Sequence, residues 1–430
     1  MTVITLQSKY CIIIRSSISG LVLADEEDWA ELIERECPCT KPGLWLDIAV
    51  AIDTSRGMTE EGLVQVLANL ATVLGPVKIA QGEGQHSRLS LITYGANATT
   101  KFDLTAFKST DEMLAGIWQT KCGNEAKTNL LDALKQTQRI FEYHHIDPER
   151  RNVKTVIIVY ASTFRQGHYE DPTQLANQIK ISGTDIIVVA FDQHGETQAL
   201  RDLEKIATPG FFFKNTAGNV AGEIQQALCL TNCFCTKQWA QYKNTFGSTE
   251  VKYGECVKIG GIDANWYPAQ KACRRMGAGR GHLVNLFDTA KHNFVAQLYK
   301  SDYRFYPPYD YHIGLSYQSK DGKSGYYWDQ PVGKKPIPQE GGFFKKWAPG
   351  YPDESKGECV VAKIPSARLL ATDFTSSSEL FWENEKCSTP RRFICQKTTC
   401  DTDNYCPLNE IDQMVILPRN EEKHETEVSA

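Results

Sequence analysis

The sequence predicts two domains, a doubly wound α/β domain followed by a loop-rich domain that disulfides hold together. A chain of 430 residues is longer than the roughly 250 to 300 residues that one hydrophobic core supports. Apolar runs alternate with amphipathic segments of helical length over residues 44–228, which is typical of a parallel sheet. Ten of the 14 cysteines fall in residues 229–406, whereas residues 40–228 contain only Cys122. We therefore expect a poorly bridged first domain and a stapled second domain.

Composition indicates a soluble globular protein, with 41% hydrophobic and 23% charged residues. The formal charge of −5 and the wide separation of the paired arginines argue against a nucleic-acid partner. Residues 1–24 resemble a weak signal peptide in which Arg15 interrupts the apolar run. No later stretch approaches the roughly 20 apolar residues of a membrane span, and the charged end 420–430 is expected to be disordered.

The elements of the first domain follow from β-branched runs and from the helical segments between them. Such runs are typical of strands that are buried on both faces of a sheet, with helices as right-handed crossovers. A ligand of this fold is expected at the carboxyl ends of the strands. The expected strands are 45–52, 88–94, 153–160 and 185–191, and the expected helices are 60–74, 129–141 and 172–181.

The end of the first strand, Asp53-Thr54-Ser55-Arg56-Gly57, resembles the metal-binding loop of the von Willebrand factor A domain. In that family, a D-x-S-x-S loop, a later threonine and an aspartate after the fourth strand hold magnesium. The resemblance implies that the ligands here are Asp53, Ser55 and Thr128. Gly57 replaces the second serine and Ser162 replaces the aspartate, so charge is lost and we expect no magnesium. The alternative is that Asp53 satisfies loop amides.

Residues 233–398 differ in character, because aromatic residues, glycines and cysteines become frequent and helical periodicity occurs only over 267–276 and 288–299. The order of short strands and helices resembles the α+β C-type lectin-like domain over this whole segment. The motifs that carry the resemblance are Ile313-Gly314-Leu315, the loop with Trp347, Gly350 and Pro352, the spacing from Trp382 to Cys387, and Phe393-Ile394-Cys395.

The lectin resemblance also implies a disulfide framework. No cysteine pair has the spacing of a zinc site, so disulfides are the expected state. Outside the lectin-like segment the pairing of Cys37 and Cys39 with Cys229 and Cys233 stays open, and Cys122 has no obvious partner. Cys400 and Cys406 suit a small loop. The pairs that the resemblance implies are Cys235 with Cys256, Cys273 with Cys395, and Cys359 with Cys387.

Sugar-binding lectins of this type hold calcium through an E-P-N or Q-P-D triplet, a further glutamate and a W-N-D motif. The corresponding residues here are Tyr351-Pro352-Asp353, Glu358, and the pair Glu383-Asn384 after Trp382. A phenol replaces an amide or carboxylate oxygen at the first position, and the remaining oxygens are fewer than the 6 to 8 that calcium takes. Calcium is therefore the implied cofactor of a degenerate site.

The combined layout resembles secreted nematode lectin-like proteins of surface or microbial recognition, and thus of innate immunity. No catalytic motif is present, so we expect no enzyme. Two functions stay open, carbohydrate binding with calcium and metal-independent binding of a protein or matrix ligand. In either case we expect an extracellular glycan or protein to bind at the loop 347–358 together with 382–384.

Overall fold

The computed structural model describes residues 35–144, 148–164, 169–192, 200–246, 249–320, 322–339, 344–365 and 379–408. The predicted export signal at 1–24 and the charged end at 420–430 lie outside these residues. Within them, the first part of the chain forms a sheet with the order β3-β2-β1-β4-β5-β6. β3 is antiparallel to β2 and the other neighbouring strands are parallel. The doubly wound α/β class predicted from the sequence is thus confirmed.

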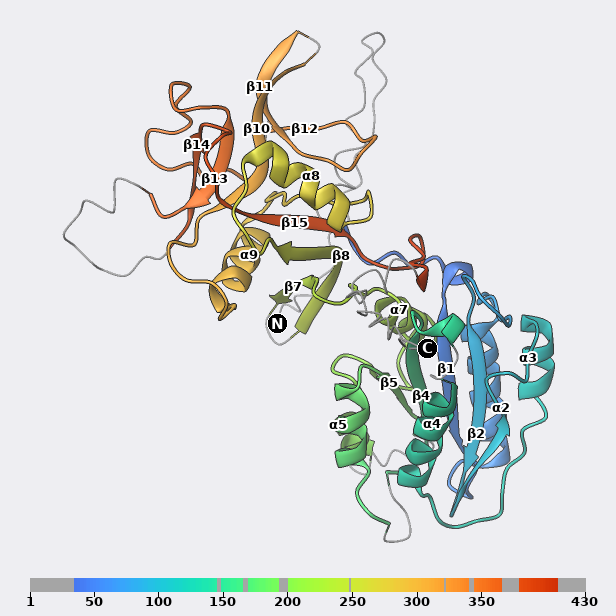
Figure 1. The fold of residues 1–430 in the computed structure, drawn as a ribbon. Coiled ribbons are helices and arrows are strands. Elements are labelled where there is room, and N and C mark those ends of the chain that lie inside the picture. The colour runs from blue at the N-terminus through green and yellow to red at the C-terminus, as the bar shows by residue number, and fades with distance from the viewer. Residues whose placement is uncertain are drawn as a thin grey trace, which may run out of the picture. The chain divides into compact units, whose positions relative to one another are not determined.

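Helices cover both faces of this sheet, as Figure 1 shows with α2 and α3 on one side and α4 and α5 on the other. The short edge strand β3 and the helices α3 and α7 were not predicted from the sequence. The strands are β1 (Leu46–Asp53), β2 (Arg88–Tyr94), β3 (Ala98–Phe102), β4 (Lys154–Ala161), β5 (Asp185–Ala190) and β6 (Phe212–Lys214). The helices are α2 (Glu60–Leu74), α3 (Thr110–Ile117), α4 (Leu130–His144), α5 (Thr173–Ile181) and α7 (Val220–Thr231).

The central strands bury alternate residues in two separate cores. Ile48 and Val50 of β1 pack with Leu67 of α2, whereas Ile157 of β4 packs with Leu134 of α4 on the other face. All eight residues of β1 are buried, because successive side chains of a strand point to opposite faces and both faces are covered. The loops at the carboxyl ends of these strands are therefore held on a rigid base.

The second part of the chain forms a mixed sheet, in which β10 pairs with β11, β13 and β15. β10 runs parallel to β15 and antiparallel to β13. The strands are β7 (Ala240–Phe246), β8 (Thr249–Ile259), β9 (His282–Leu283), β10 (Tyr311–Lys320), β11 (Lys323–Trp328), β12 (Ile337–Pro338), β13 (Cys359–Lys363), β14 (Phe381–Glu385) and β15 (Arg392–Thr398). The helices are α8 (Trp266–Met276) and α9 (Thr289–Ser301).

Both helices of this second part follow from their sequences. Trp266, Ala269 and Cys273 form the buried stripe of α8 at the helical period. Asp288 caps α9 by accepting a hydrogen bond from the backbone N–H of Lys291 at 2.8 Å. Cys273 is joined to Cys395 on β15, so a disulfide ties α8 to the sheet.

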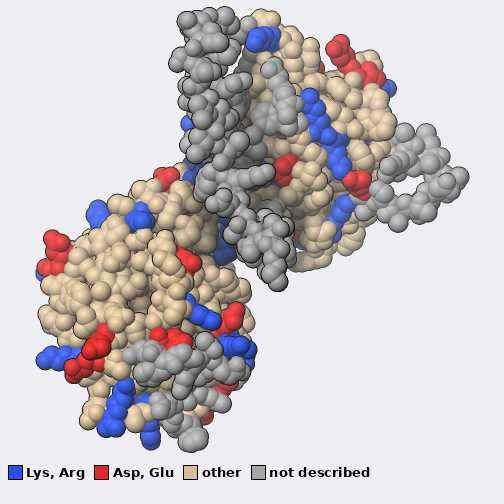
Figure 2. All heavy atoms as spheres, turned by 180° about the vertical axis from the view of Figure 1, so that it is seen from behind, with Lys and Arg blue, Asp and Glu red and all other residues tan. Residues whose placement is uncertain are grey.

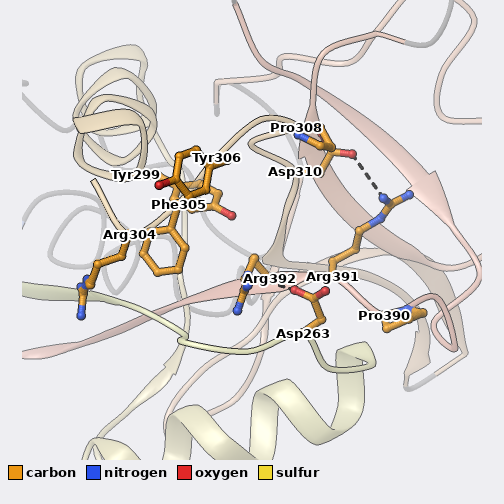
Figure 3. A pocket seen from close by; sticks show the side chains of 10 residues that line it. All are labelled: Asp263, Tyr299, Arg304, Phe305, Tyr306, Pro308, Asp310, Pro390, Arg391 and Arg392. Atoms are coloured by element: carbon orange, nitrogen blue, oxygen red, sulfur yellow. Dashed lines mark hydrogen bonds and ion pairs between the residues drawn. The ribbon is translucent and has the colours of Figure 1, made fainter. Parts of the chain in front are cut away.

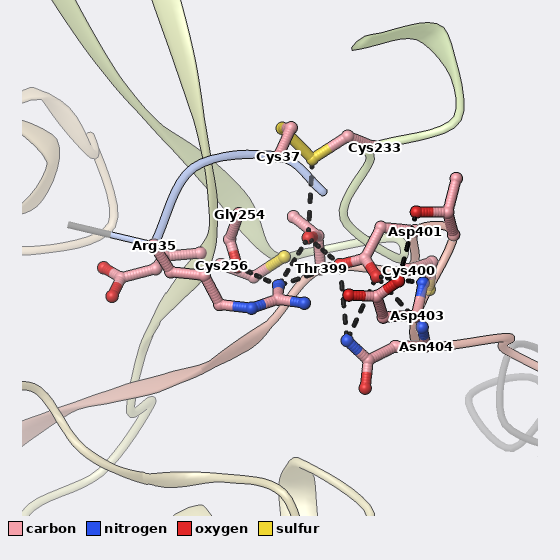
Figure 4. Close-up of polar contacts among 12 residues, drawn as sticks. Arg35, Cys37, Cys233, Gly254, Cys256, Thr399, Cys400, Asp401, Asp403 and Asn404 are labelled. Atoms are coloured by element: carbon pink, nitrogen blue, oxygen red, sulfur yellow. Dashed lines mark hydrogen bonds and ion pairs between the residues drawn. A yellow bond between two sulfur atoms is a disulfide. The ribbon is translucent and has the colours of Figure 1, made fainter. Parts of the chain in front are cut away.

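Residues 399–406 follow β15 and form a small closed loop, since Cys400 is joined to Cys406. The buried carboxylate of Asp401 pairs with Arg35 at 2.8 Å and accepts a hydrogen bond from Thr399 at 2.7 Å (Figure 4). The indole of Trp45, which precedes β1, donates to the Asp401 carbonyl at 3.0 Å. Residues from both ends of the described chain therefore meet at this loop.

Acidic and basic side chains are interspersed on the face seen in Figure 2. That mixture fits the mildly acidic composition and the absence of a basic run in the sequence. No helix in the described part of the chain combines the length and the hydropathy that a bilayer span requires.

Candidate functional site

The first candidate site lies at the carboxyl end of β1, where Asp53 is completely buried. Its Oδ1 accepts a hydrogen bond from the backbone N–H of Ser55 at 2.9 Å. Its Oδ2 accepts hydrogen bonds from the hydroxyl of Ser162 at 2.5 Å and from the backbone N–H of Ser162 at 3.2 Å. Ser162 directly follows β4, the parallel neighbour of β1, so the sheet itself brings the two residues together.

The other predicted ligands lie at the same end of the sheet. The hydroxyl of Thr128 shares a hydrogen bond with the hydroxyl of Thr163, the residue after Ser162, at 2.8 Å. The Ser55 hydroxyl accepts from the backbone N–H of Gly57 at 3.3 Å. The structure therefore places Asp53, Ser55 and Thr128 at one end of the sheet, and whether they bind a ligand stays a prediction.

The chemistry of this cluster does not fit magnesium. Burial raises the pKa of Asp53, and the hydrogen bonds from Ser162 and Ser55 offset only part of that rise. The oxygens of its carboxylate already accept hydrogen bonds from the backbone and side chains of Ser55 and Ser162, and a hydroxyl stands where the family has a second carboxylate. Within the described ranges, no three side chains of histidine, cysteine, aspartate or glutamate gather in a way that would hold a metal ion. The geometry matches the alternative in which Asp53 satisfies loop donors.

The second candidate site is the loop 347–358, which is held by Asn384 of β14. The Asn384 amide nitrogen donates to the carbonyl of Asp353 at 2.7 Å and to the carbonyl of Gly357 at 2.6 Å. Its amide oxygen accepts from the backbone N–H of Asp353 at 2.8 Å. Asn384 is buried, so these bonds are shielded from water. One side-chain amide thus closes both ends of the turn 353–357.

Asp353 and Glu358 lie at the surface of this loop. The Asp353 carboxylate accepts from the hydroxyl of Ser355 at 2.7 Å and from its backbone N–H at 3.0 Å. Those hydrogen bonds lower the pKa of Asp353, so its carboxylate is charged at neutral pH. Glu358 is exposed, and its carbonyl accepts from the backbone N–H of Tyr317 at 2.7 Å.

Glu383 is buried next to Asn384 and has its own partners. Its Oε2 lies 3.5 Å from the Nζ of Lys363 on β13. The phenol of Tyr351, which precedes Pro352 through a cis peptide bond, donates a hydrogen bond to Glu383. Burial, and after it the Glu383 carboxylate, raise the pKa of Tyr351. The Glu383 carboxylate is therefore already in contact with the ammonium group of Lys363 and the phenol of Tyr351.

These contacts do not fit a calcium ion held in the manner that the resemblance implies. The structure brings Tyr351, Asp353, Glu383 and Asn384 together, but Lys363 is paired with Glu383, and the Asn384 amide group donates two hydrogen bonds to the loop backbone and accepts one from it. An oxygen-seeking cation requires several oxygens that are free to turn toward it. The loop is instead closed by hydrogen bonds and one ion pair.

Sequence reasoning missed Lys363, which became visible only with the strand register. Val361 lies opposite Glu383 in the antiparallel pair of β13 and β14. Lys363 is two residues from Val361, so it projects from the same face of the hairpin as Glu383. The alternation of β13 predicts that Lys363 and Val361 share a face, but only the pairing register shows that Glu383 lies on that face.

Aromatic packing and disulfides support the base of the lectin-like loop. Trp382 is completely buried and packs edge-on against Trp347 and Trp328. Cys359 and Cys387 are joined where β13 begins and just after β14 ends. The described pairs are Cys37 with Cys233, Cys39 with Cys229, Cys235 with Cys256, Cys273 with Cys395, Cys359 with Cys387, and Cys400 with Cys406.

Comparison with known families agrees with the two resemblances. Residues 47–227 match the sequence model of the von Willebrand factor type A domain. Residues 262–397 match the model of the lectin C-type domain. The chain is also 29% identical over 385 residues to C-type lectin domain-containing protein 160 of Caenorhabditis elegans. That alignment covers 86% of this chain and 56% of the relative, so the chain spans little more than half of the relative's length.

Two solved structures are among those that are similar to part of the chain. Proximal thread matrix protein 1 from the mussel byssus is 16% identical with a TM-score of 0.35, over 45% of this chain and 46% of that protein. Human lithostathine is 20% identical with a TM-score of 0.27, over 39% of this chain and 92% of that protein.

Proposed function

We propose that this chain, which is a von Willebrand factor type A domain followed by a C-type lectin domain, is an extracellular recognition protein that binds its ligand without calcium. Both families are binding modules, and a lectin domain suggests a glycan or a protein as ligand. The observation that carries the proposal is the Asn384 amide, whose three hydrogen bonds close the loop that an ion closes in sugar-binding relatives.

The exposed part of this loop supports it as the docking surface. Tyr351 is half-buried and Pro352 is exposed, so an aromatic ring and an apolar ring lie next to the charged carboxylate of Asp353. Glu354 and Glu358 are exposed on the same loop. An aromatic ring beside carboxylates suits a sugar ring or a basic segment of a protein. The loop is already ordered, so binding would cost little conformational entropy.

An extracellular location is supported by the cysteines. Six disulfides are present among the described residues, and such a density is typical of an oxidising compartment. The predicted export signal at residues 1–24 would place the chain there. Non-reducing peptide mapping of protein secreted from animal cells tests both points, and free thiols at Cys359 and Cys387 would contradict them.

Metal independence is tested by screening the full chain against glycans and extracellular proteins in EDTA and in calcium. We expect the same ligands under both conditions. Tyr351→Ala combined with Asp353→Ala is expected to abolish binding, while Lys345→Ala, an exposed change just outside the loop, preserves it. Binding that EDTA abolishes would contradict the proposal, and so would binding that the double substitution leaves unchanged.

A further inference from the structure

A pocket of about 280 Å³ in the second part of the chain shares no residue with the loop 347–358 (Figure 3). Its walls come from the end of α9 and the loop that follows, from the turn before α8, and from the residues that lead into β15. This volume is near the lower limit of the roughly 300 to 1,000 Å³ typical of small-molecule sites. The pocket therefore suits one ring rather than an extended chain.

Tyr299 at the end of α9 is the most buried polar residue of this pocket. Only 1% of its surface is exposed, and its ring packs edge-on against Phe305, Tyr309 and Tyr311. Its hydroxyl oxygen is not fully enclosed, and it makes no hydrogen bond within the described part of the chain. Burial raises the pKa of Tyr299 to about 12, so the hydroxyl keeps its proton and can both donate and accept. A hydroxyl with no partner in the protein is free to bond to water or to a ligand in the pocket.

Arg392 and Asp263 supply the charged groups on the opposite wall. The Nε of Arg392 lies 3.0 Å from the Oδ1 of Asp263, and one terminal nitrogen donates to the Gly261 carbonyl. The other terminal nitrogen, Nη2, has no partner among the described residues. The guanidinium also lies 5.4 Å from the centre of the Phe305 ring, a distance at which a cation is attracted to the ring. Two N–H donors and one carboxylate oxygen are thus left for a ligand.

Tyr306 completes the pocket with an aromatic ring that is 79% exposed. A large exposed aromatic residue at the edge of a polar pocket is typical of a ligand contact, because it offers apolar area with few rotatable bonds. Tyr303, 87% exposed on the same loop, does not line the pocket. The two tyrosines therefore form a matched pair for experiment.

We propose that this pocket binds a carboxylated pyranose, such as a uronic acid residue at the end of a glycan. The carboxylate would accept hydrogen bonds from Nη2 of Arg392, a charge-assisted contact. Ring hydroxyls would bond to the Tyr299 hydroxyl and to Asp263, and the apolar face of the sugar would lie on Tyr306. Arg304 is paired with Asp302, and Arg391 with Asp310 and Glu385, so the preference for an anionic sugar over a neutral one rests on the Nη2 group of Arg392. The site does not depend on the function proposed for the lectin loop.

Calorimetric titration of the full chain with D-glucuronate, D-glucose and acetate tests this assignment. We expect glucuronate to bind and glucose to bind at least tenfold more weakly, because glucose cannot accept hydrogen bonds from Arg392 as a carboxylate. Acetate, which has the charge without the ring, is expected to compete only at much higher concentration. If acetate binds as tightly as glucuronate, the pocket is an anion site and the sugar assignment is wrong.

Two pairs of substitutions locate the binding. Tyr306→Ala is expected to weaken glucuronate binding by roughly three- to tenfold, whereas Tyr303→Ala leaves it unchanged. Tyr299→Phe removes one hydroxyl and is expected to weaken binding by about tenfold, whereas Tyr311→Phe removes a buried hydroxyl outside the pocket and leaves affinity unchanged. Failure of glucuronate to bind, or equal effects within each pair, would overturn the proposal. Loss of binding on Tyr351→Ala alone would assign the sugar to the lectin loop instead.

Discussion

Asn384 and Asp53 hold corresponding roles in the two domains, since each is a buried side chain whose hydrogen bonds fix a loop. Asn384 makes three such bonds to the backbone of the turn 353–357. Asp53 accepts hydrogen bonds from Ser55 and Ser162. In each domain, these hydrogen bonds join residues that the resemblance to the two families implies as metal ligands. If the proposal is right, these loops keep their order without a metal ion.

Replacement of Asn384 by the aspartate of calcium-binding relatives tests this view in the lectin domain. An aspartate cannot donate to the carbonyls of Asp353 and Gly357, so we expect Asn384→Asp to lower the unfolding free energy by about 3 kcal/mol in EDTA. Calcium at a hundred times its dissociation constant would restore roughly 2.7 kcal/mol if the new carboxylate binds it. Denaturant titration with and without calcium measures both effects, and an equal calcium gain in the unaltered protein would contradict the interpretation.

Magnesium provides the corresponding test in the first domain. We expect about 5 to 10 mM magnesium to leave the melting temperature of the unaltered chain unchanged, because Asp53 is buried against Ser162. This concentration is roughly a hundred times the dissociation constant of a functional magnesium site. Ser162→Asp restores the second carboxylate and is expected to melt earlier without metal, since two carboxylates would then face each other. A magnesium-dependent rise in the unaltered protein that Asp53→Ala removes would show that the native site binds metal.

At the scale of elements, the sequence predicts strands and helices well where periodicity is strong. β1, β4, β5 and the helices α2 and α8 agree with the predicted spans to within one or two residues. β3 escaped prediction because its alternate residues are only half buried, so its pattern is weak. The polar partner Lys363 in the second site escaped as well, because it meets Glu383 only through the β13 to β14 register.

The small loop that Cys400 and Cys406 close is an element whose contribution can be measured directly. The chain-entropy relation gives about 2 kcal/mol for a disulfide that spans so few residues. We therefore expect Cys400→Ser combined with Cys406→Ser to lower the unfolding free energy by about that amount, plus the loss of any contact that Asp401 and Tyr405 make through the loop. Urea denaturation of the secreted chain measures the change. A neutral result would mean that Asp401 alone fixes the segment.

For the whole molecule, buried histidines set the response of stability to acid. Burial lowers the pKa of His86, His282 and His292 to about 4. Their ordinary value is 6.5, so the unfolded chain takes up protons first, and the stability present above pH 6.5 is lost as the pH falls toward 4. Buried carboxylates with raised pKa, Asp53 and Asp329 among them, act in the opposite direction.

His282→Gln isolates the histidine part of this response. Between pH 7.5 and pH 5, the unfolding free energy of the unaltered protein is expected to fall by about 2 kcal/mol more than that of the variant. The reason is that His282 stays neutral in the folded protein, whereas the same histidine binds a proton in the unfolded chain. Chemical denaturation at the two pH values gives the difference. If the gap between the two proteins does not change with pH, His282 titrates normally and the burial argument for it fails.

The contacts of residues 399–406 have a consequence for the order in which the protein is completed on the ribosome. Tyr405 packs on Trp45 at a ring separation of 4.9 Å, and Asn152 donates to the Cys406 carbonyl at 2.8 Å. These contacts join parts of the chain that are synthesised several hundred residues apart. N-terminal domains usually fold first during synthesis. Phe234 already packs on the Trp45 indole, but the part that Tyr405 covers stays exposed until translation has passed the entire lectin domain, and a fragment that stops at residue 398 never gains that contact.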